Sequence, residues 1–133
     1  MADGRRLSGA ALLRARWLPV AGYVALIFFL SSQPGLTVPG EFKLRDKIAH
    51  CLEYGGLSFL VFRAVRDTWP SAPAARRLLL AALSVAALGA VDERFQASVP
   101  GRDSSVYDWM ADATGATLAQ VIGWALSRRR KET

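Results

Sequence analysis

Residues 17–30 read WLPVAGYVALIFFL, an uncharged and strongly apolar stretch. Three further apolar stretches follow it: residues 48–62, interrupted only by His50 and Glu53, and the uncharged residues 78–91 and 113–127. Four such stretches predict an all-α fold of four helices. A helix that crosses a bilayer needs about 20 apolar residues, whereas runs of about 10–14 are more typical of buried helices in soluble proteins. The runs alone therefore leave two alternatives, a membrane bundle and a soluble bundle.

The distribution of charge favours the membrane bundle. If four helices cross a membrane, twelve of the 17 Lys and Arg residues lie on the side of the two chain ends and the middle loop. These are Arg5, Arg6, Arg14, Arg16, Arg63, Arg66, Arg76, Arg77, Arg128, Arg129, Arg130 and Lys131. The other five lie on the opposite side or near it, with eight of the 11 acids. Because Lys and Arg are enriched in cytoplasmic segments, we expect both termini to be cytoplasmic.

We therefore expect a single domain over residues 1–133, a multi-pass protein of the cytoplasmic (inner) membrane. Its transmembrane helices should lie at about 12–31, 46–66, 76–97 and 105–126. A cleaved signal peptide is the alternative for the first helix, but residues 31–36 (SSQPGL) lack an A-x-A-like cleavage site. The single cysteine, Cys51, excludes an internal disulfide. Pro100-Gly101 predicts a type II turn before the last helix.

The net charge of +6 raises the question of a nucleic-acid partner. The basic residues flank apolar runs, however, and lack the aromatic stacking partners of a nucleic-acid site. A basic inner face instead suits the anionic inner leaflet of a membrane. The expected partner is the lipid bilayer, with no nucleic acid.

Polar residues collect at the outer end of the predicted second helix. Asp46, His50 and Glu53 are spaced i, i+4 and i+7, which places them on one stripe of that helix. Asp46 also suits a helix N-terminus, where the dipole favours an acid. Glu53 lies two turns into an apolar helix, where a carboxylate must be paired or protonated.

The third and fourth helices carry the matching polar groups. Asp92, Glu93 and Gln96 end the third helix, although acids at a helix C-terminus oppose the dipole and need another reason. Ser105-x-x-Asp108 matches a capping box, in which the acid reaches back to the cap residue. Asp112 lies one turn deeper and has no capping role. Ionisable groups at membrane depth usually mark a functional site.

Three interpretations of this polar cluster remain open. A divalent metal such as Mg, Mn or Zn could be bound by His50, Glu53, Asp92 and Asp112. A phosphate or acidic headgroup would be bound by basic side chains, and the third possibility is a structural ion-pair network. The candidate catalytic residues are His50, Glu53, Asp92, Glu93 and Asp112. The candidate binding residues are Asp46, Lys47, Gln96, Arg102 and Asp108.

Several motifs together resemble the VanZ-like family of small bacterial membrane proteins. They are Ser31-Ser32-Gln33-Pro34, Asp46-Lys47-Ile48-Ala49-His50 with Glu53-Tyr54-Gly55, Asp92-Glu93-Arg94-Phe95-Gln96, Pro100-Gly101-Arg102, and Asp108 with Asp112-Ala113-Thr114-Gly115. Where that family often has Asn, this chain has Asp112. The resemblance implies an integral membrane protein of the bacterial cell envelope, and the family's namesake is linked to low-level teicoplanin resistance.

Two functions follow as hypotheses. In the first, the extracytoplasmic polar cluster binds an envelope component, such as a lipid-linked cell-wall intermediate, or shields it from a teicoplanin-type glycopeptide. In the second, the cluster is the active site of a membrane enzyme, a metal-assisted hydrolase or transferase acting on a polar or lipid-linked substrate. Glu53 or His50 would then be the general base.

Overall fold

The computed structural model describes residues 9–34 and 43–129, and within these ranges all regular structure is helical. The four helices are α1 (Gly9–Ser31), α2 (Lys43–Thr68), α3 (Ala74–Gln96) and α4 (Val106–Arg129). The prediction of an all-α fold is therefore confirmed, and each helix boundary lies within three residues of the predicted one. Asp46 does not open its helix, because α2 begins three residues earlier at Lys43.

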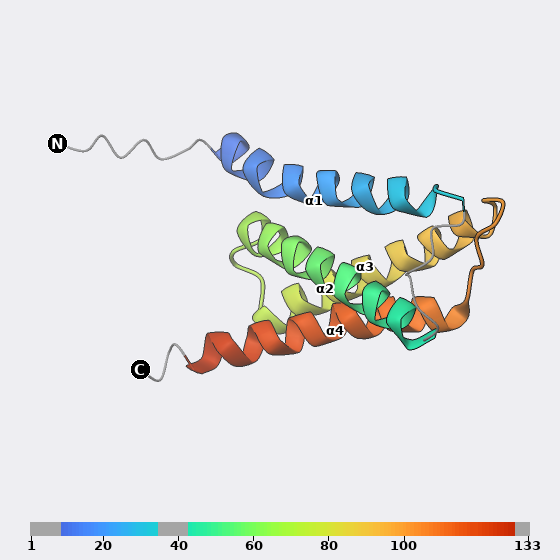
Figure 1. Ribbon diagram of the computed structural model, residues 1–133. Helices are drawn as coiled ribbons and strands as arrows, with labels where there is room; N and C mark the ends of the chain where they lie inside the picture. Colours follow the sequence, from blue (N-terminus) through green and yellow to red (C-terminus); the bar gives the residue numbers. More distant parts are fainter. Residues whose placement is uncertain (1–8, 35–42, 130–133) are drawn as a thin grey trace.

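The helices run up and down between two ends of the molecule (Figure 1). The start of α1, the end of α4 and the α2–α3 loop lie at one end, and the α3–α4 connection lies at the other. The first of these ends carries Arg14, Arg16, Arg63, Arg66, Arg76 and Arg77. At 23 to 26 residues, each helix is about 34–39 Å long. These lengths exceed the hydrocarbon core of a bilayer, which is about 30 Å thick.

The α2 helix is the centre of the bundle. It packs against the other three helices and most extensively against α4, whereas α1 rests mainly on α2 and touches α3 only slightly. At the basic end, Arg16 Nε lies 2.6 Å from Asp67 Oδ2, and Trp17 Nε1 donates to Thr68 Oγ1 at 2.9 Å. These contacts attach α1 to α2 where both helices carry arginines.

Glycine permits the close approach of α2 and α4. A Cβ atom on Gly115 would overlap the carbonyl oxygen of Cys51 and would lie 2.7 Å from its carbonyl carbon, so something would have to shift. A Cβ on Gly55 would lie 3.3 Å from the carbonyl oxygen of Gly115. Small residues at a helix crossing allow two backbones to touch, which is how membrane helices commonly associate.

The turn between α3 and α4 matches the sequence prediction. Arg102 N donates to Val99 O at 3.2 Å, which closes a four-residue turn around Pro100 and Gly101. Gly101 has a φ of 79°, the value that a type II turn requires at its third position. This turn places the start of α4 beside the end of α3.

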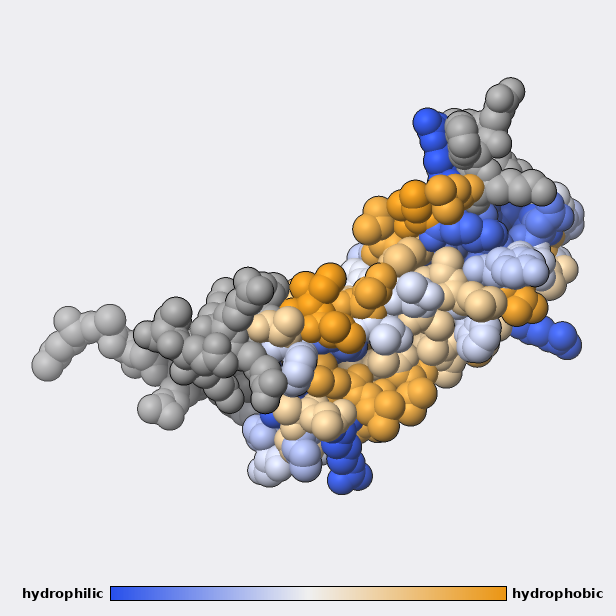
Figure 2. Space-filling view, turned by 90° about the horizontal axis from the view of Figure 1, so that it is seen from below, coloured by the Kyte–Doolittle hydropathy of each residue, from blue (hydrophilic) through white to orange (hydrophobic). Residues whose placement is uncertain are grey.

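Many large apolar side chains lie on the surface of the bundle. Large side chains that are at least half exposed include Leu18, Phe29, Leu52, Phe59, Leu83, Val121 and Ile122. Figure 2 shows broad apolar areas on one face, with hydrophilic residues gathered toward one end. Ser58 and Gln120 are buried instead, and Gln120 Nε2 donates to Ser58 Oγ at 2.6 Å. Extended exposed apolar surface is typical of a protein that contacts another apolar phase.

Three of the helices are long and apolar enough to cross a membrane, namely those spanning Gly9–Ser31, Leu44–Thr68 and Ala74–Gln96. Within the described residues α4 does not meet the same criterion, although it is 24 residues long. The polar side chains of Asp108, Asp112 and Gln120 lower its hydropathy, and all three are buried inside the bundle.

Candidate functional site

Two polar contacts join α2 to α4 at the end of the bundle opposite the arginines. His50 Nδ1 lies 2.8 Å from Asp112 Oδ1, and Lys47 Nζ forms an ion pair with Asp108 Oδ1. His50, Asp108 and Asp112 are all buried, and Asp112 is completely inaccessible. Because a charge buried without a partner is very costly, these pairs also hold the two helices in register.

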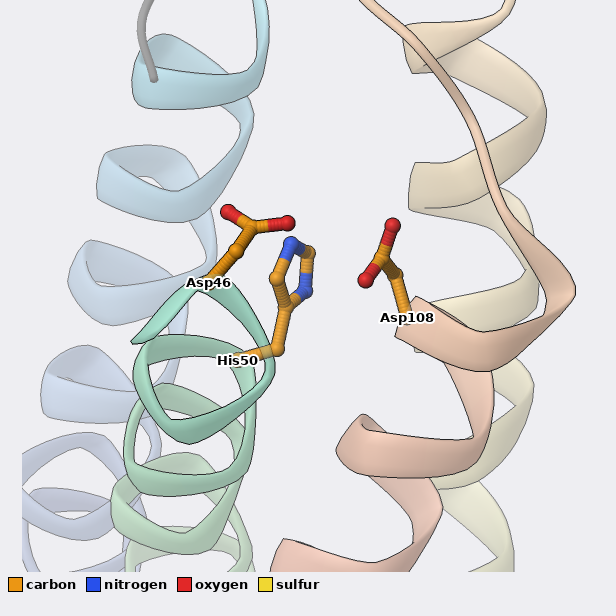
Figure 3. A group of neighbouring side chains, drawn as sticks. All are labelled: Asp46, His50 and Asp108. Atoms are coloured by element: carbon orange, nitrogen blue, oxygen red, sulfur yellow. The ribbon is translucent and has the colours of Figure 1, made fainter. Parts of the chain in front are cut away.

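Asp46, His50 and Asp108 form an outer group. Figure 3 shows their side chains pointing toward one another, with the first two on α2 and the third on α4. One donor atom from each lies within 4.8 Å of the others. Lys47 already supplies a positive charge here, since its Nζ pairs with Asp108 and lies 3.8 Å from Asp46 Oδ2. Lys47 therefore supplies a counterion to the acids of the outer group.

His50, Glu93 and Asp112 form an inner group, with donor atoms again within 4.8 Å of one another. All three are buried, and they come from three different helices. Glu93 is held in place because its Oε2 accepts a hydrogen bond from Ser105 N at 2.9 Å. Glu93 Oε1 and Asp112 Oδ2 are buried and have no hydrogen-bond partner in residues 9–34 and 43–129.

The capping prediction for Asp108 needs a correction. Ser105 does cap α4, because its Oγ accepts from Tyr107 N at 3.1 Å. The acid that bonds the backbone N–H of Ser105 is Glu93 of α3, not Asp108. The carboxyl group of Asp108 instead turns toward Lys47 of α2. The capping box fails because an interhelical ion pair takes the acid that the local motif would use.

Asp92 is the hub of a separate polar network. Its Oδ2 accepts hydrogen bonds from Ser31 Oγ at 2.9 Å, Tyr54 OH at 3.1 Å and Gln96 Nε2 at 2.9 Å. Gln96 Nε2 also donates to Ser31 Oγ at 3.1 Å. The network joins α1, α2 and α3, which gives Asp92 and Gln96 a structural role. Its other oxygen, Asp92 Oδ1, is buried without a partner in the described part of the chain.

Tyr54 and Ser31 were not among the candidate residues. Tyr54 follows His50 by four residues, and it is fully buried. The buried stripe of α2 thus continues from His50 to Tyr54 and leaves Glu53 half-buried at its edge. The helical spacing from His50 could have identified Tyr54, whereas nothing local in the sequence indicates that Ser31 bonds a residue of α3.

The remaining candidates lie around these groups. Tyr23 OH donates to the main-chain oxygen of Glu53 at 3.0 Å, and Glu53 is half-buried. Arg102 is half-buried in the α3–α4 connection. Of the predicted metal ligands, the structure brings His50 and Asp112 together and adds Glu93. Glu53 and Asp92 lie outside both groups that could bind a metal ion.

No family model, no curated protein and no solved structure matches this chain. The resemblance to the VanZ-like family therefore stays a prediction. What the arrangement can do chemically follows from its own groups. A buried imidazole oriented by a carboxylate can transfer a proton, and buried carboxylates with free oxygens can bind a cation.

Proposed function

We propose that this chain is an integral membrane protein of the bacterial cell envelope, with four transmembrane helices and both termini in the cytoplasm. The apolar surface of the bundle supports insertion into a bilayer. The arginines at the end of α2 and the start of α3 support a cytoplasmic location for that end. In this orientation α4 crosses the membrane with its buried acids facing the bundle and not the lipid.

The proposed role is to bind a polar envelope component on the extracytoplasmic side, such as the headgroup of a lipid-linked cell-wall intermediate. One observation carries this proposal. Asp92, Glu93, Asp108 and Asp112 are all buried at the same end of the bundle, each at most 8% exposed. Ionisable groups at membrane depth are expensive and usually retained for a site. Lys47, which pairs with Asp108 and is part-exposed, would also meet the phosphate of an anionic headgroup at this end.

A second function has its own observation. The 2.8 Å contact between His50 Nδ1 and Asp112 Oδ1 fixes the imidazole ring, as an orienting carboxylate does for a general base. A membrane hydrolase or transferase acting on a lipid-linked substrate would use this pair. Incubation of the purified protein with such a lipid, followed by mass spectrometry, separates the two functions because only an enzyme changes the mass of the lipid.

The binding function is tested with His50→Ala in a teicoplanin-susceptible bacterium. The chain should lower susceptibility to teicoplanin, and the variant should lose this effect while its amount in the membrane stays normal. Asp67→Asn is the matched control, because Asp67 lies at the basic end and pairs with Arg16. A wild-type chain without effect on susceptibility, and without affinity for a lipid-linked intermediate in nanodiscs, would contradict the proposed function.

A further inference from the structure

The inner group holds two carboxyl groups and one imidazole. Lys47 neutralises Asp108, but His50 is the one basic group in the inner group, where it meets both Glu93 and Asp112. Both acids are more than nine-tenths buried. Carboxyl groups that are buried together must be protonated or must share a cation. The inner group is therefore short of positive charge in a way that the outer group is not.

The unpartnered oxygens support the same conclusion independently. Glu93 Oε1 and Asp112 Oδ2 are buried without a hydrogen-bond partner in the described residues. In each carboxyl group the other oxygen is engaged, Glu93 Oε2 by Ser105 N and Asp112 Oδ1 by His50 Nδ1. A buried acceptor left unpaired costs about 1–3 kcal/mol. The carboxyl groups are thus fixed in place while each keeps one oxygen available to a ligand.

The spacing of the donor atoms suits a bound ion. Two ligands of a tetrahedral ion, each at about 2.0–2.1 Å from it, are about 3.3 Å apart. His50, Glu93 and Asp112 each place one donor atom within 4.8 Å of the donor atoms of the other two. A small movement of these side chains therefore brings one donor atom of each to the same ion. A cation bound here replaces the proton that lies between the imidazole and the carboxylate.

We propose that His50, Glu93 and Asp112 bind one divalent transition-metal cation, Zn²⁺ or Mn²⁺. One imidazole with two carboxylates suits these ions, whereas Ca²⁺ prefers six to eight oxygen ligands. Three protein ligands leave at least one coordination position open for water or for an oxygen of a headgroup phosphate. A bound cation would give the proposed function a direct ligand for the headgroup phosphate, and this part of the inference rests on the proposed function. The binding of the cation to the chain does not depend on that function.

The outer group competes for the same imidazole and is the alternative site. Asp46 and Asp108 also lie within 4.8 Å of a donor atom of His50. The ammonium group of Lys47 already pairs with Asp108 there, so a metal ion would have to displace it. Each group contains an acid that the other lacks, because Glu93 belongs only to the inner group and Asp46 only to the outer group. Substitution of either acid therefore distinguishes the two sites.

The test uses the full chain in detergent, purified with a histidine-free tag because His50 is the only histidine. The protein is treated with a chelator and dialysed against Mn²⁺ or Zn²⁺, and the bound metal is measured by mass spectrometry. We expect one cation per chain. Glu93→Gln and Asp112→Asn should weaken binding by more than about tenfold. Asp46→Asn should leave the affinity within about twofold, and circular dichroism checks that each variant keeps its helices.

Three results would overturn the proposal. In the first, the wild-type chain binds less than a tenth of an equivalent of either metal at millimolar concentration. In the second, the Glu93→Gln variant binds the metal with unchanged affinity. In the third, the Asp46→Asn variant loses the metal while Glu93→Gln retains it. None of these results depends on membrane orientation or on a lipid ligand. A chain that binds the cation but no lipid-linked component would contradict the proposed function alone.

Discussion

Gly115→Ala tests the close crossing of α2 and α4. The new Cβ would overlap the carbonyl oxygen of Cys51 and would lie 2.7 Å from its carbonyl carbon, whereas ordinary contacts begin at 3.4 Å, so the two helices must part locally by at least about 0.7 Å. A gap of about 0.5–1 Å forfeits a quarter to a half of the dispersion attraction between facing atoms. For a contact of on the order of 40 atom pairs at about 0.1–0.2 kcal/mol each, the loss is about 2 kcal/mol.

The same substitution in open space should have the opposite effect. A Cβ on Gly123, in the same helix, meets no heavy atom within 4 Å. Replacing a helical glycine by alanine there should stabilise the protein by about 0.5–1 kcal/mol, because the unfolded chain loses freedom. Thermal unfolding in detergent, followed by circular dichroism, measures both variants. Gly115→Ala should lower Tm and Gly123→Ala should not. If both variants raise Tm equally, the backbones of α2 and α4 do not touch at Gly115.

Two other substitutions test the buried polar contacts by the same unfolding measurement. Asp92→Ala removes the acceptor of three hydrogen bonds, from Ser31, Tyr54 and Gln96. It should lower the free energy of unfolding by about 3 kcal/mol or more, and Asp92→Asn should lower it less because it keeps an acceptor oxygen. An Asp92→Ala variant as stable as the wild type would exclude a structural role for this hub. Ser58→Ala removes the hydrogen bond to Ala116 O and the one accepted from Gln120 Nε2, which together should cost about 1–3 kcal/mol. Ser84→Ala is its control, since exposed Ser84 bonds only its own helix, and equal effects would argue against an interhelical role for Ser58.

The fold could be predicted from the sequence because its signals are local. The uncharged stretch at 78–91 and the Pro100-Gly101 turn each indicate structure within a few residues, and the structure has α3 and a turn of the expected kind at these places. Helix ends were predicted less exactly: α1 and α2 each begin three residues before the predicted start, and Asp46 lies in the first turn of α2. The apolar runs were too short to define the full helices, which extend into polar residues at both ends.

The site could be predicted only in part, because it is built from contacts between helices. Helical spacing brought His50 into the candidate set, and the lack of a capping role did the same for Asp112. Their mutual contact joins residues 62 positions apart. Glu93 was an obvious polar residue, but its bond to Ser105 depends on how the α3–α4 turn folds back. Glu53 was selected because it lies two turns into an apolar helix. The residue of α2 that is fully buried is the next one, Tyr54, whereas Glu53 is half-buried.

The central claim is that the buried polar cluster lies on the outer side of a membrane and the arginine-rich end on the inner side. Ser104, beside α4, and Ser71, in the α2–α3 loop, are both exposed and lie at opposite ends of the bundle. Each is changed to cysteine in a Cys51→Ser background, and intact cells are treated with a membrane-impermeant thiol reagent. The account predicts that position 104 is labelled and position 71 is labelled only after the cells are opened. Labelling of position 71 in intact cells, with position 104 protected, would contradict it.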